Sequence, residues 1–144
     1  MLKLGVIWDG RKAENVLRGF LDDLKVRKVD LKAVVVIGSR ARGVWKPSSD
    51  IDLVIVVGGE EDLRKILVAK NIGIIDPKPY TVKDLWEALR GVDTTIVEAL
   101  ECGVVVYDDG IWRLLRKEYE RSLKGKVKID FDESGKISRI ILIS

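Results

Sequence analysis

Two carboxylates stand together at the start of an apolar run. Asp50 and Asp52 open the stretch D-I-D-L-V-I-V-V, whose residues 51–57 are predicted to form a strand. Because alternate strand residues face the same side, the two carboxylates should point the same way, about 7 Å apart along the chain. Like charges at that range repel each other unless a cation lies between them. Oxygen ligands on a rigid strand suit Mg²⁺, so the pattern predicts a magnesium site.

A second polar signal precedes these acids. Residues 32–37 are predicted to be a strand covered on both faces, because they are apolar at both parities, and they end in Gly38-Ser39. Gly38 permits a sharp turn and the close approach of a ligand, and Ser39 offers a hydroxyl and an N–H to a phosphate. In the loop that follows, Arg40, Arg42 and Lys46 are candidates for contacts with phosphate groups. The same pattern is also compatible with an ordinary solvated loop in which these charges pair with nearby acids.

The Gly38-Ser39 pair, the ten residues 40–49 and the Asp50-x-Asp52 motif resemble the signature of the DNA polymerase beta-like nucleotidyltransferases. The closest resemblance is to their minimal nucleotidyltransferase (MNT) branch. It extends over about residues 33–110, including I-V-E-A-L-E-C-G-V-V-V-Y-D-D-G at 96–110. The resemblance implies a nucleotidyltransferase fold of the α/β (α+β) class, with a mixed β-sheet and helices packed mainly on one face.

The resemblance also implies a role for each motif residue. Gly38 and Ser39 would grip the triphosphate of a nucleotide, with Arg40 and Arg42 as further nucleotide-binding residues. A two-metal Mg²⁺ site would be held by a carboxylate set that is also catalytic: Asp50, Asp52 and a third acid from a neighbouring strand, for which Asp76 is the candidate. Asp76 lies five residues before Thr81, a predicted helix cap. Pro77 departs from the family pattern, and Asp-Pro is also a common turn opener.

The remaining elements follow from hydrophobic periodicity and from turn and cap residues. We expect helices over 11–29, 60–70, 82–90, 94–101 and 111–123, strands over 71–76 and 104–107, and a C-terminal β-hairpin of 126–131 and 136–143. Pro77 and Pro79 are expected to stop the 71–76 strand. The prediction is one domain over 1–144, with a core of about 30–110 and a C-terminal helix and hairpin over 111–144.

The amino-acid composition excludes several kinds of catalytic and metal-binding site. The sequence has no histidine, which excludes a Ser-His-Asp mechanism and zinc–histidine sites, and its single cysteine, Cys102, cannot form an intrachain disulfide. The net charge of +3 is spread along the chain, so there is no strong signal for duplex nucleic acid. No apolar run is long enough to span a bilayer and no signal peptide is recognisable, so a cytoplasmic protein is expected. The many charged and few thermolabile side chains indicate a thermophile.

The resemblance implies that this chain transfers AMP from ATP to a hydroxyl acceptor with Mg²⁺ as cofactor. Relatives with small-molecule or RNA acceptors usually carry an extra helical domain, for which the chain lacks the length. MNT proteins are often antitoxin partners of helical HEPN ribonucleases, and some modify a tyrosine of the toxin, so a HEPN-like partner is expected. Two alternatives are a non-catalytic binding module and a free-standing enzyme acting on a small molecule or an RNA 3′ end. The base preference stays open, as does a homo-oligomer formed through the hairpin edge.

Overall fold

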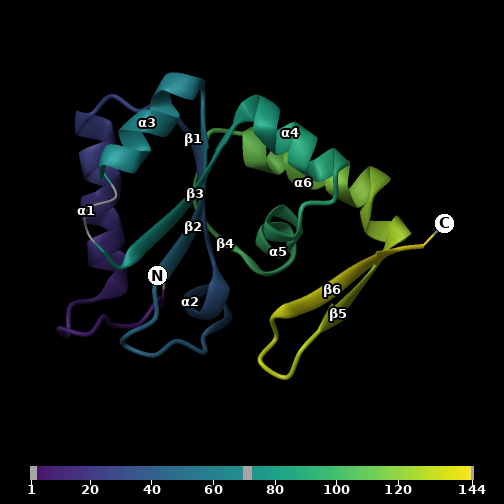
Figure 1. Cartoon of the computed structure of the whole chain (residues 1–144), viewed down its shortest axis with the longest axis horizontal. Helices are drawn as coiled ribbons and strands as arrows, with labels where there is room; N and C mark the ends of the chain where they lie inside the picture. Colours follow the sequence, from purple (N-terminus) through teal and green to yellow (C-terminus); the bar gives the residue numbers. More distant parts are fainter. Residues whose placement is uncertain (1–2, 70–72, 144) are drawn as a thin grey trace.

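A computed structural model describes residues 3–69 and 73–143 (Figure 1). Within these residues the helices are α1 (Ala13–Val26), α2 (Gly38–Arg42), α3 (Glu60–Ala69), α4 (Val82–Arg90), α5 (Thr94–Cys102), α6 (Ile111–Ser122) and the short 3-10 helix η2 (Lys124–Lys126). The strands are β1 (Leu31–Ile37), β2 (Ile51–Val57), β3 (Ile75–Thr81), β4 (Val104–Asp108), β5 (Val127–Phe131) and β6 (Ile137–Leu142). In the described part of the chain, no helix is both long and apolar enough to cross a membrane.

The central sheet is mixed, as predicted. Its strand order is β3-β2-β1-β4, with β1 antiparallel to both β2 and β4, and β2 parallel to β3. The register sets Asp52 opposite Ile37 on one side and opposite Asp76 on the other. The strand pairing therefore brings the Gly-Ser turn and the predicted third carboxylate to the same end of the sheet.

Helices cover both faces of this sheet, so the expectation that they pack mainly on one face is wrong. On one face, Val34 and Val36 belong to a core shared with α1 and α3. On the other, Val35 and Val54 belong to a core shared with α4, α5 and α6 (Figure 1). The reason lies in the strands themselves: β1 and β2 are apolar and buried at both parities, and each buried face needs its own cover.

Strand β3 differs most from the prediction. The sequence suggested a strand over 71–76 that ends at Pro77, but residues 71 and 72 lie outside the described part and β3 runs from Ile75 through both prolines to Thr81. β3 is an edge strand. Residues two apart in a strand direct their backbone nitrogens to the same side, so Pro77 and Pro79 both face the open edge, where no N–H is needed. Asp76 is therefore held inside a strand and not at a frayed end.

The helix caps predicted from sequence are confirmed. The Asp84 N–H donates to Thr81 Oγ1 at 3.1 Å and the Thr81 N–H donates to Asp84 Oδ2 at 3.3 Å, which forms a capping box at α4. Asp93 caps α5 by accepting the Ile96 N–H at 3.1 Å. The helix α1 is shorter than predicted at both ends, and the last residue of the predicted 60–70 helix lies outside the described residues.

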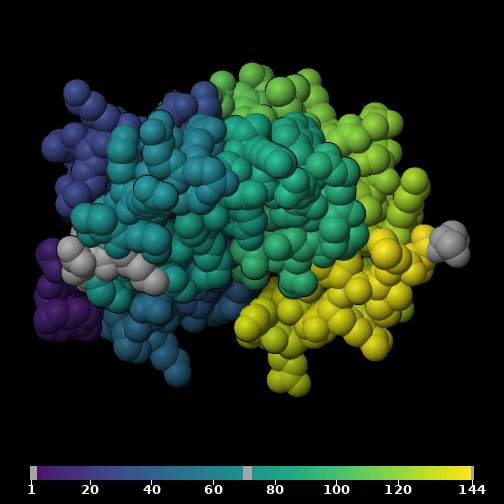
Figure 2. Space-filling model, turned by 45° about the horizontal axis from the view of Figure 1, so that its top comes forward, coloured from purple at the N-terminus to yellow at the C-terminus, as the bar shows by residue number. Residues whose placement is uncertain are grey.

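The predicted C-terminal hairpin is present and is docked on the protein body. Ile137 is buried, and Ile129 and Ile140 pack beside it against the core formed with α4, α5 and α6. In Figure 2 the hairpin, in yellow, lies directly against the green helices. Its turn approaches α2: a Cβ added at Gly135 would lie 3.7 Å from Cδ of Arg42. The hairpin turn is thereby brought close to α2, which begins at Gly38.

Candidate active site

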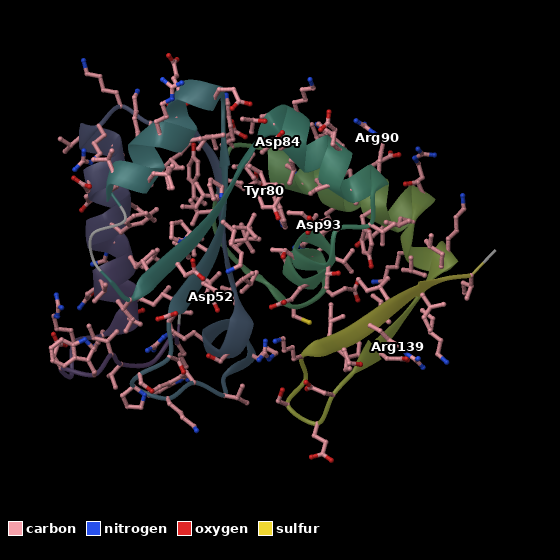
Figure 3. All side chains as sticks on the ribbon, viewed as in Figure 1. Asp52, Tyr80, Asp84, Arg90, Asp93 and Arg139 are labelled. Carbon is pink, nitrogen blue, oxygen red and sulfur yellow. The ribbon has the colours of Figure 1, made fainter. Side chains whose placement is uncertain are left out.

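The predicted carboxylates come together at one end of the sheet. Asp50 directly precedes β2, Asp52 lies on β2 and Asp76 on β3, and one carboxylate oxygen from each lies within 4.8 Å of the other two. Asp50 is exposed and the other two are half-buried. Figure 3 labels Asp52 at the end of the sheet next to α2. Three carboxylates open to solvent on one side are the hard oxygen donors that Mg²⁺ binds, so the residues present fit a divalent cation.

A lysine that the sequence analysis did not single out neutralises part of this cluster. Lys78 Nζ lies 3.1 Å from Asp76 Oδ2 and 3.8 Å from Asp52 Oδ1. It follows Asp76 by two residues in β3 and therefore faces the same side of the sheet. The alternation would have identified Lys78, but the strand was predicted to stop at Pro77.

The electrostatics of Asp52 favour a bound cation. Burial raises the pKa of Asp52 above its usual value, Asp76 and Asp50 raise this pKa further by repulsion, and Lys78 offsets part of the increase. The ionised carboxylate is therefore held at a cost in the protein alone. A divalent cation would relieve that repulsion more fully than the single charge of Lys78 does.

Gly38, the first residue of the Gly-Ser turn, lies directly against the Asp52 carboxylate. Its φ is +77°, a conformation that favours glycine, and a Cβ added there would lie 2.5 Å from Asp52 Oδ2. Its N–H donates to Glu98 Oε2 at 3.0 Å. Any larger residue at position 38 would collide with the Asp52 carboxylate, which explains the glycine in structural terms.

Arg40 does not belong to the pocket, contrary to its predicted role in nucleotide binding. The side chain is 1% exposed, and Nη1 donates to the carbonyls of Leu4 at 2.8 Å and Val6 at 3.0 Å. Nη2 donates to the carbonyl of Ser49 at 2.8 Å. The guanidinium thus fastens the N-terminal segment to the loop before β2, and its donors are used by the backbone.

Arg42, by contrast, lines a pocket beside the carboxylates. The pocket measures about 340 Å³ and is lined by Ile37, Gly38, Ser39, Arg42, Asp52, Lys78, Thr95, Glu98 and Lys136. Gly38, Ser39 and Arg42 were predicted to bind the nucleotide, and they are here together. Thr95, Glu98 and Lys136 were missed, because they come from α5 and the hairpin turn and no local motif connects these segments to α2.

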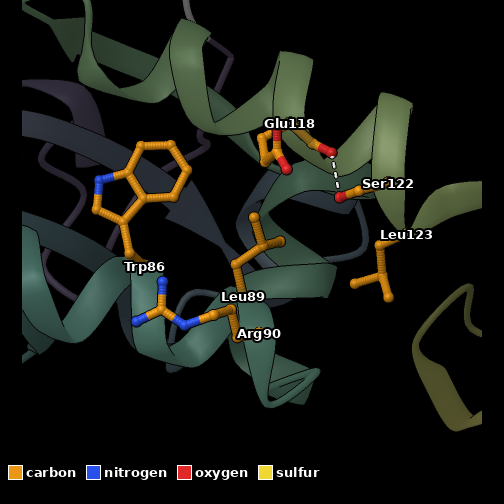
Figure 4. A pocket seen from close by; sticks show the side chains of 6 residues that line it. All are labelled: Trp86, Leu89, Arg90, Glu118, Ser122 and Leu123. Atoms are coloured by element: carbon orange, nitrogen blue, oxygen red, sulfur yellow. Dashed lines mark hydrogen bonds between the residues drawn. The ribbon is translucent and has the colours of Figure 1, made fainter.

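A second pocket, of about 260 Å³, lies between α4 and α6 (Figure 4). It is lined by Trp86, Leu89, Arg90, Glu118, Ser122 and Leu123. The Ser122 hydroxyl donates to the Glu118 carbonyl at 2.7 Å. None of the residues predicted for the site lines this pocket.

Comparison with known proteins identifies the family. The sequence matches the family described as nucleotidyltransferase domain over residues 17–139, which is most of the chain. No curated protein matches the sequence. One similar solved structure is described as "Crystal structure of the toxin-antitoxin with AMP-PNP"; it is 17% identical, the alignment covers 78% of this chain and 88% of that chain, and the TM-score is 0.48. On the match over residues 17–139, this chain belongs to the nucleotidyltransferase domain family.

Proposed function

We propose that this protein is a Mg²⁺-dependent nucleotidyltransferase of the MNT branch that transfers AMP from ATP to a hydroxyl group of a partner protein. The observation that carries the proposal is the meeting of Asp50, Asp52 and Asp76 within 4.8 Å of one another, beside a pocket that contains Gly38 and Arg42. The carboxylates supply metal ligands, and the pocket supplies N–H groups that can donate hydrogen bonds to phosphate oxygens. Phosphoryl transfer needs both.

In this proposal the carboxylates act on the reacting centre. Asp50, Asp52 and Asp76 would hold Mg²⁺, which neutralises charge on the phosphoryl oxygens and lowers the pKa of the attacking hydroxyl. The acceptor oxygen forms a bond to the α-phosphorus while the bond from that phosphorus to the bridging oxygen breaks, and pyrophosphate leaves. Asp76, on the edge strand, accepts the proton of the acceptor hydroxyl and passes it to solvent.

The pocket residues hold the leaving pyrophosphate. The Ser39 hydroxyl and the N–H groups at the start of α2 donate to the terminal phosphates, and Arg42 offers a guanidinium that can bind two oxygens at once. Lys78 and Lys136, from β3 and the hairpin turn, add two further cations to the lining. Their combined charge offsets that of the triphosphate.

The acceptor is proposed to come from another protein. The pocket beside the carboxylates measures about 340 Å³ and is lined by residues already proposed to hold the triphosphate. Within the described residues, the helices and strands form the central sheet, its two cores and the docked hairpin, and none forms a separate acceptor domain. The resemblance of residues 33–110 to MNT proteins favours a HEPN-like helical partner, and hence an antitoxin role in the cytoplasm.

A second candidate is a non-catalytic antitoxin that blocks its partner sterically. One observation favours it: internal charges already occupy both halves of the site, Lys78 among the carboxylates and Glu98 at the Gly38 amide. In that case the site residues would preserve the fold and would not turn over nucleotide.

Calorimetric titration with ATP and Mg²⁺ tests the proposal. The wild-type chain should bind ATP in a metal-dependent manner, and an Asp50→Asn/Asp52→Asn variant should not. Cytidine and guanosine triphosphates, titrated in parallel, would establish the base preference. If the folded wild-type chain binds none of these nucleotides, the enzymatic proposal fails and the steric candidate takes its place.

The thermophile assignment is likewise a proposal. Several of the described ion pairs join exposed side chains, such as Arg27 with Asp23 and Arg121 with Glu118, and the desolvation penalty of ion pairs falls as the temperature rises. A Tm within the mesophile range of about 45–65 °C would contradict it.

A further inference from the structure

The Glu98 carboxylate occupies an anion position inside the pocket. Its Oε2 accepts the Gly38 N–H at 3.0 Å and lies 3.7 Å from Nη1 of Arg42. These are the two groups assigned above to the phosphates of the nucleotide. The Glu98 and Arg42 side chains are 15% and 14% exposed, so the contact lies inside the protein and not on its outer surface.

The helix that carries Glu98 is firmly fixed. Asp93, labelled in Figure 3, caps the start of α5, and Ile96, Val97 and Leu100 are buried in the core that α5 shares with the sheet. Glu98 is therefore presented to α2 by a rigid element. Its position is built into the fold, as is that of Gly38 at the end of β1.

The contact between Glu98 and Arg42 is nonetheless incomplete. The separation of 3.7 Å is longer than a direct hydrogen bond. Arg42 Nε is buried and, among the described residues, has no hydrogen-bond partner. A phosphate group can take Nε and a terminal nitrogen of the guanidinium together, a bidentate pairing that Glu98 does not make here. Arg42 therefore keeps a buried donor that Glu98 leaves unused and that a bound phosphate can take.

We propose that Glu98 is a specificity-determining residue that competes with the terminal phosphates of the nucleotide for Gly38 and Arg42. The inference rests on the proposed function, since it concerns the same pocket. The Gly38 amide has one hydrogen to donate, and two anions beside one guanidinium repel each other. A bound phosphate therefore requires Glu98 to withdraw.

This competition discriminates between anions. Phosphate, pyrophosphate or AMP would have to displace Glu98 from Gly38 and Arg42, and each would form only a few new contacts with the pocket in return. A nucleoside triphosphate with its metal also gains the carboxylates and Lys78, which offset the loss of the Glu98 contact. Glu98 thereby keeps simple phosphate anions out of the pocket and reserves it for the metal-bound triphosphate.

The test compares wild type, Glu98→Gln and a matched control, Glu101→Gln, by calorimetry. Gln keeps the side chain's shape and an oxygen that can accept the Gly38 N–H, but it removes the charge. Glu101 is on the same helix, and its carboxylate is 3.6 Å from Lys124 and outside the pocket lining. The probes are inorganic tripolyphosphate without metal and ATP with Mg²⁺.

We expect Glu98→Gln to bind tripolyphosphate about tenfold more tightly than wild type, with a smaller gain for ATP with Mg²⁺. Glu101→Gln should bind both probes as wild type does. Glu98→Ala serves as a second variant if Glu98→Gln fails to fold, and it should also bind tripolyphosphate more tightly. Unchanged or weaker binding of tripolyphosphate by a folded variant would overturn the inference and make Glu98 a brace for Gly38. Absence of tripolyphosphate binding by all three proteins would overturn it as well.

The two probes separate this inference from the proposed function. If wild type binds ATP with Mg²⁺ but Glu98→Gln brings no gain, the inference fails and the nucleotide site stands. If Glu98→Gln gains affinity for tripolyphosphate but no protein shows metal-dependent ATP binding, Glu98 is a competitor in an anion pocket and the nucleotidyltransferase proposal fails.

Discussion

The site has two ends: the proposed metal end, formed by Asp50, Asp52 and Asp76, and the proposed phosphate end, formed by Gly38, Ser39 and Arg42. Each end already contains a protein residue with the same sign of charge as the ligand proposed for it. At the metal end, Lys78 lies among the carboxylates, 37% exposed at the tip of a flexible side chain. At the phosphate end, Glu98 is 15% exposed and projects from a helix anchored in the core. The cation can move aside easily, whereas the anion is held more firmly. If the proposed function holds, the metal end would accept its ligand readily, and the phosphate end would release Glu98 only to the intended ligand.

Arg40 and Arg42, two residues apart in α2, also differ in role: Arg40 binds backbone carbonyls, and Arg42 lines the pocket. Substitutions at these two positions give the largest predicted effect. Arg40→Met leaves the buried carbonyl of Leu4 and the partly buried carbonyls of Val6 and Ser49 without their donor, and we expect a loss of about 3 kcal/mol in the free energy of unfolding. Arg42→Met should cost less than about 1 kcal/mol in stability but weaken ATP binding by roughly tenfold or more. Urea unfolding and calorimetry measure the two effects. If the two variants lost stability equally, the division of roles between these arginines would be wrong.

Gly38 connects the two ends, and Gly43 provides a matched control. Both have a φ of +77°, but an added Cβ would meet Asp52 Oδ2 at 2.5 Å in one case and nothing within 4 Å in the other. Each Gly→Ala change should cost about 1–2 kcal/mol in stability through the backbone conformation. Only Gly38→Ala should also abolish Mg²⁺-dependent ATP binding, since the added Cβ would displace Asp52, which we propose as a metal ligand. Loss of binding in Gly43→Ala would show that the α2 conformation matters, and not the contact with Asp52.

Lys78→Met sharpens the account of the metal end. The substitution removes the ammonium group that lies 3.1 Å from Asp76 Oδ2 and 3.8 Å from Asp52 Oδ1. We expect Mn²⁺ alone, followed by electron paramagnetic resonance, to bind roughly threefold more tightly, because one competing charge is removed. ATP with Mg²⁺ should bind less tightly, because a proposed phosphate contact is lost. A decrease in the affinity for Mn²⁺ alone would mean that Lys78 arranges the carboxylates and does not compete for them.

Asp52→Asn gives the smallest effect. Burial and two neighbouring acids raise the pKa of Asp52 above the usual 3.8, so the ionised form costs stability in the folded protein. Asn removes that charge, and the Tm at neutral pH should rise by roughly 2 °C. The difference in Tm between Asp52→Asn and wild type should shrink as the pH falls toward the ordinary carboxyl range. Because the pKa of Asp52 is raised in the folded state, the folded wild type takes up the proton before the unfolded chain does, and the wild type gains stability. A Tm that falls at neutral pH would show that the pair with Lys78 outweighs the repulsion.

Local patterns predicted the parts of the site that depend on neighbours in sequence. The spacing of Asp50 and Asp52 on β2 and the glycine at position 38 follow from strand alternation and backbone conformation, and the Thr81 and Asp93 caps follow from side chains that bond to their own turns. The structure brings Asp76 close to Asp50 and Asp52, although the sequence predicts its strand too early in the chain. Pro77 and Pro79 predict a strand end from sequence alone, and only the sheet order reveals that β3 is an edge strand that tolerates them.

The failures share a physical cause, which is contact between segments distant in sequence. Arg40 has the positive charge expected of a residue that binds phosphate. Its guanidinium instead binds the carbonyls of Leu4 and Val6, which are 36 and 34 residues away in the sequence. Glu98 is 60 residues from Gly38, and Lys136 reaches the pocket from a hairpin that resembles no motif. The apolar residues of β1 occur at both parities, which predicts that both faces of the sheet are covered. This pattern does not predict how many helices pack on each face.

The most direct test is a crystal structure of the protein with Mg²⁺ and a non-hydrolysable ATP analogue. We predict metal density bridging Asp50, Asp52 and Asp76, the triphosphate at Gly38, Ser39 and Arg42, and Glu98 turned away from the Gly38 amide. A nucleotide bound elsewhere, for example in the pocket between α4 and α6, with Glu98 still bonded to Gly38, would contradict the account.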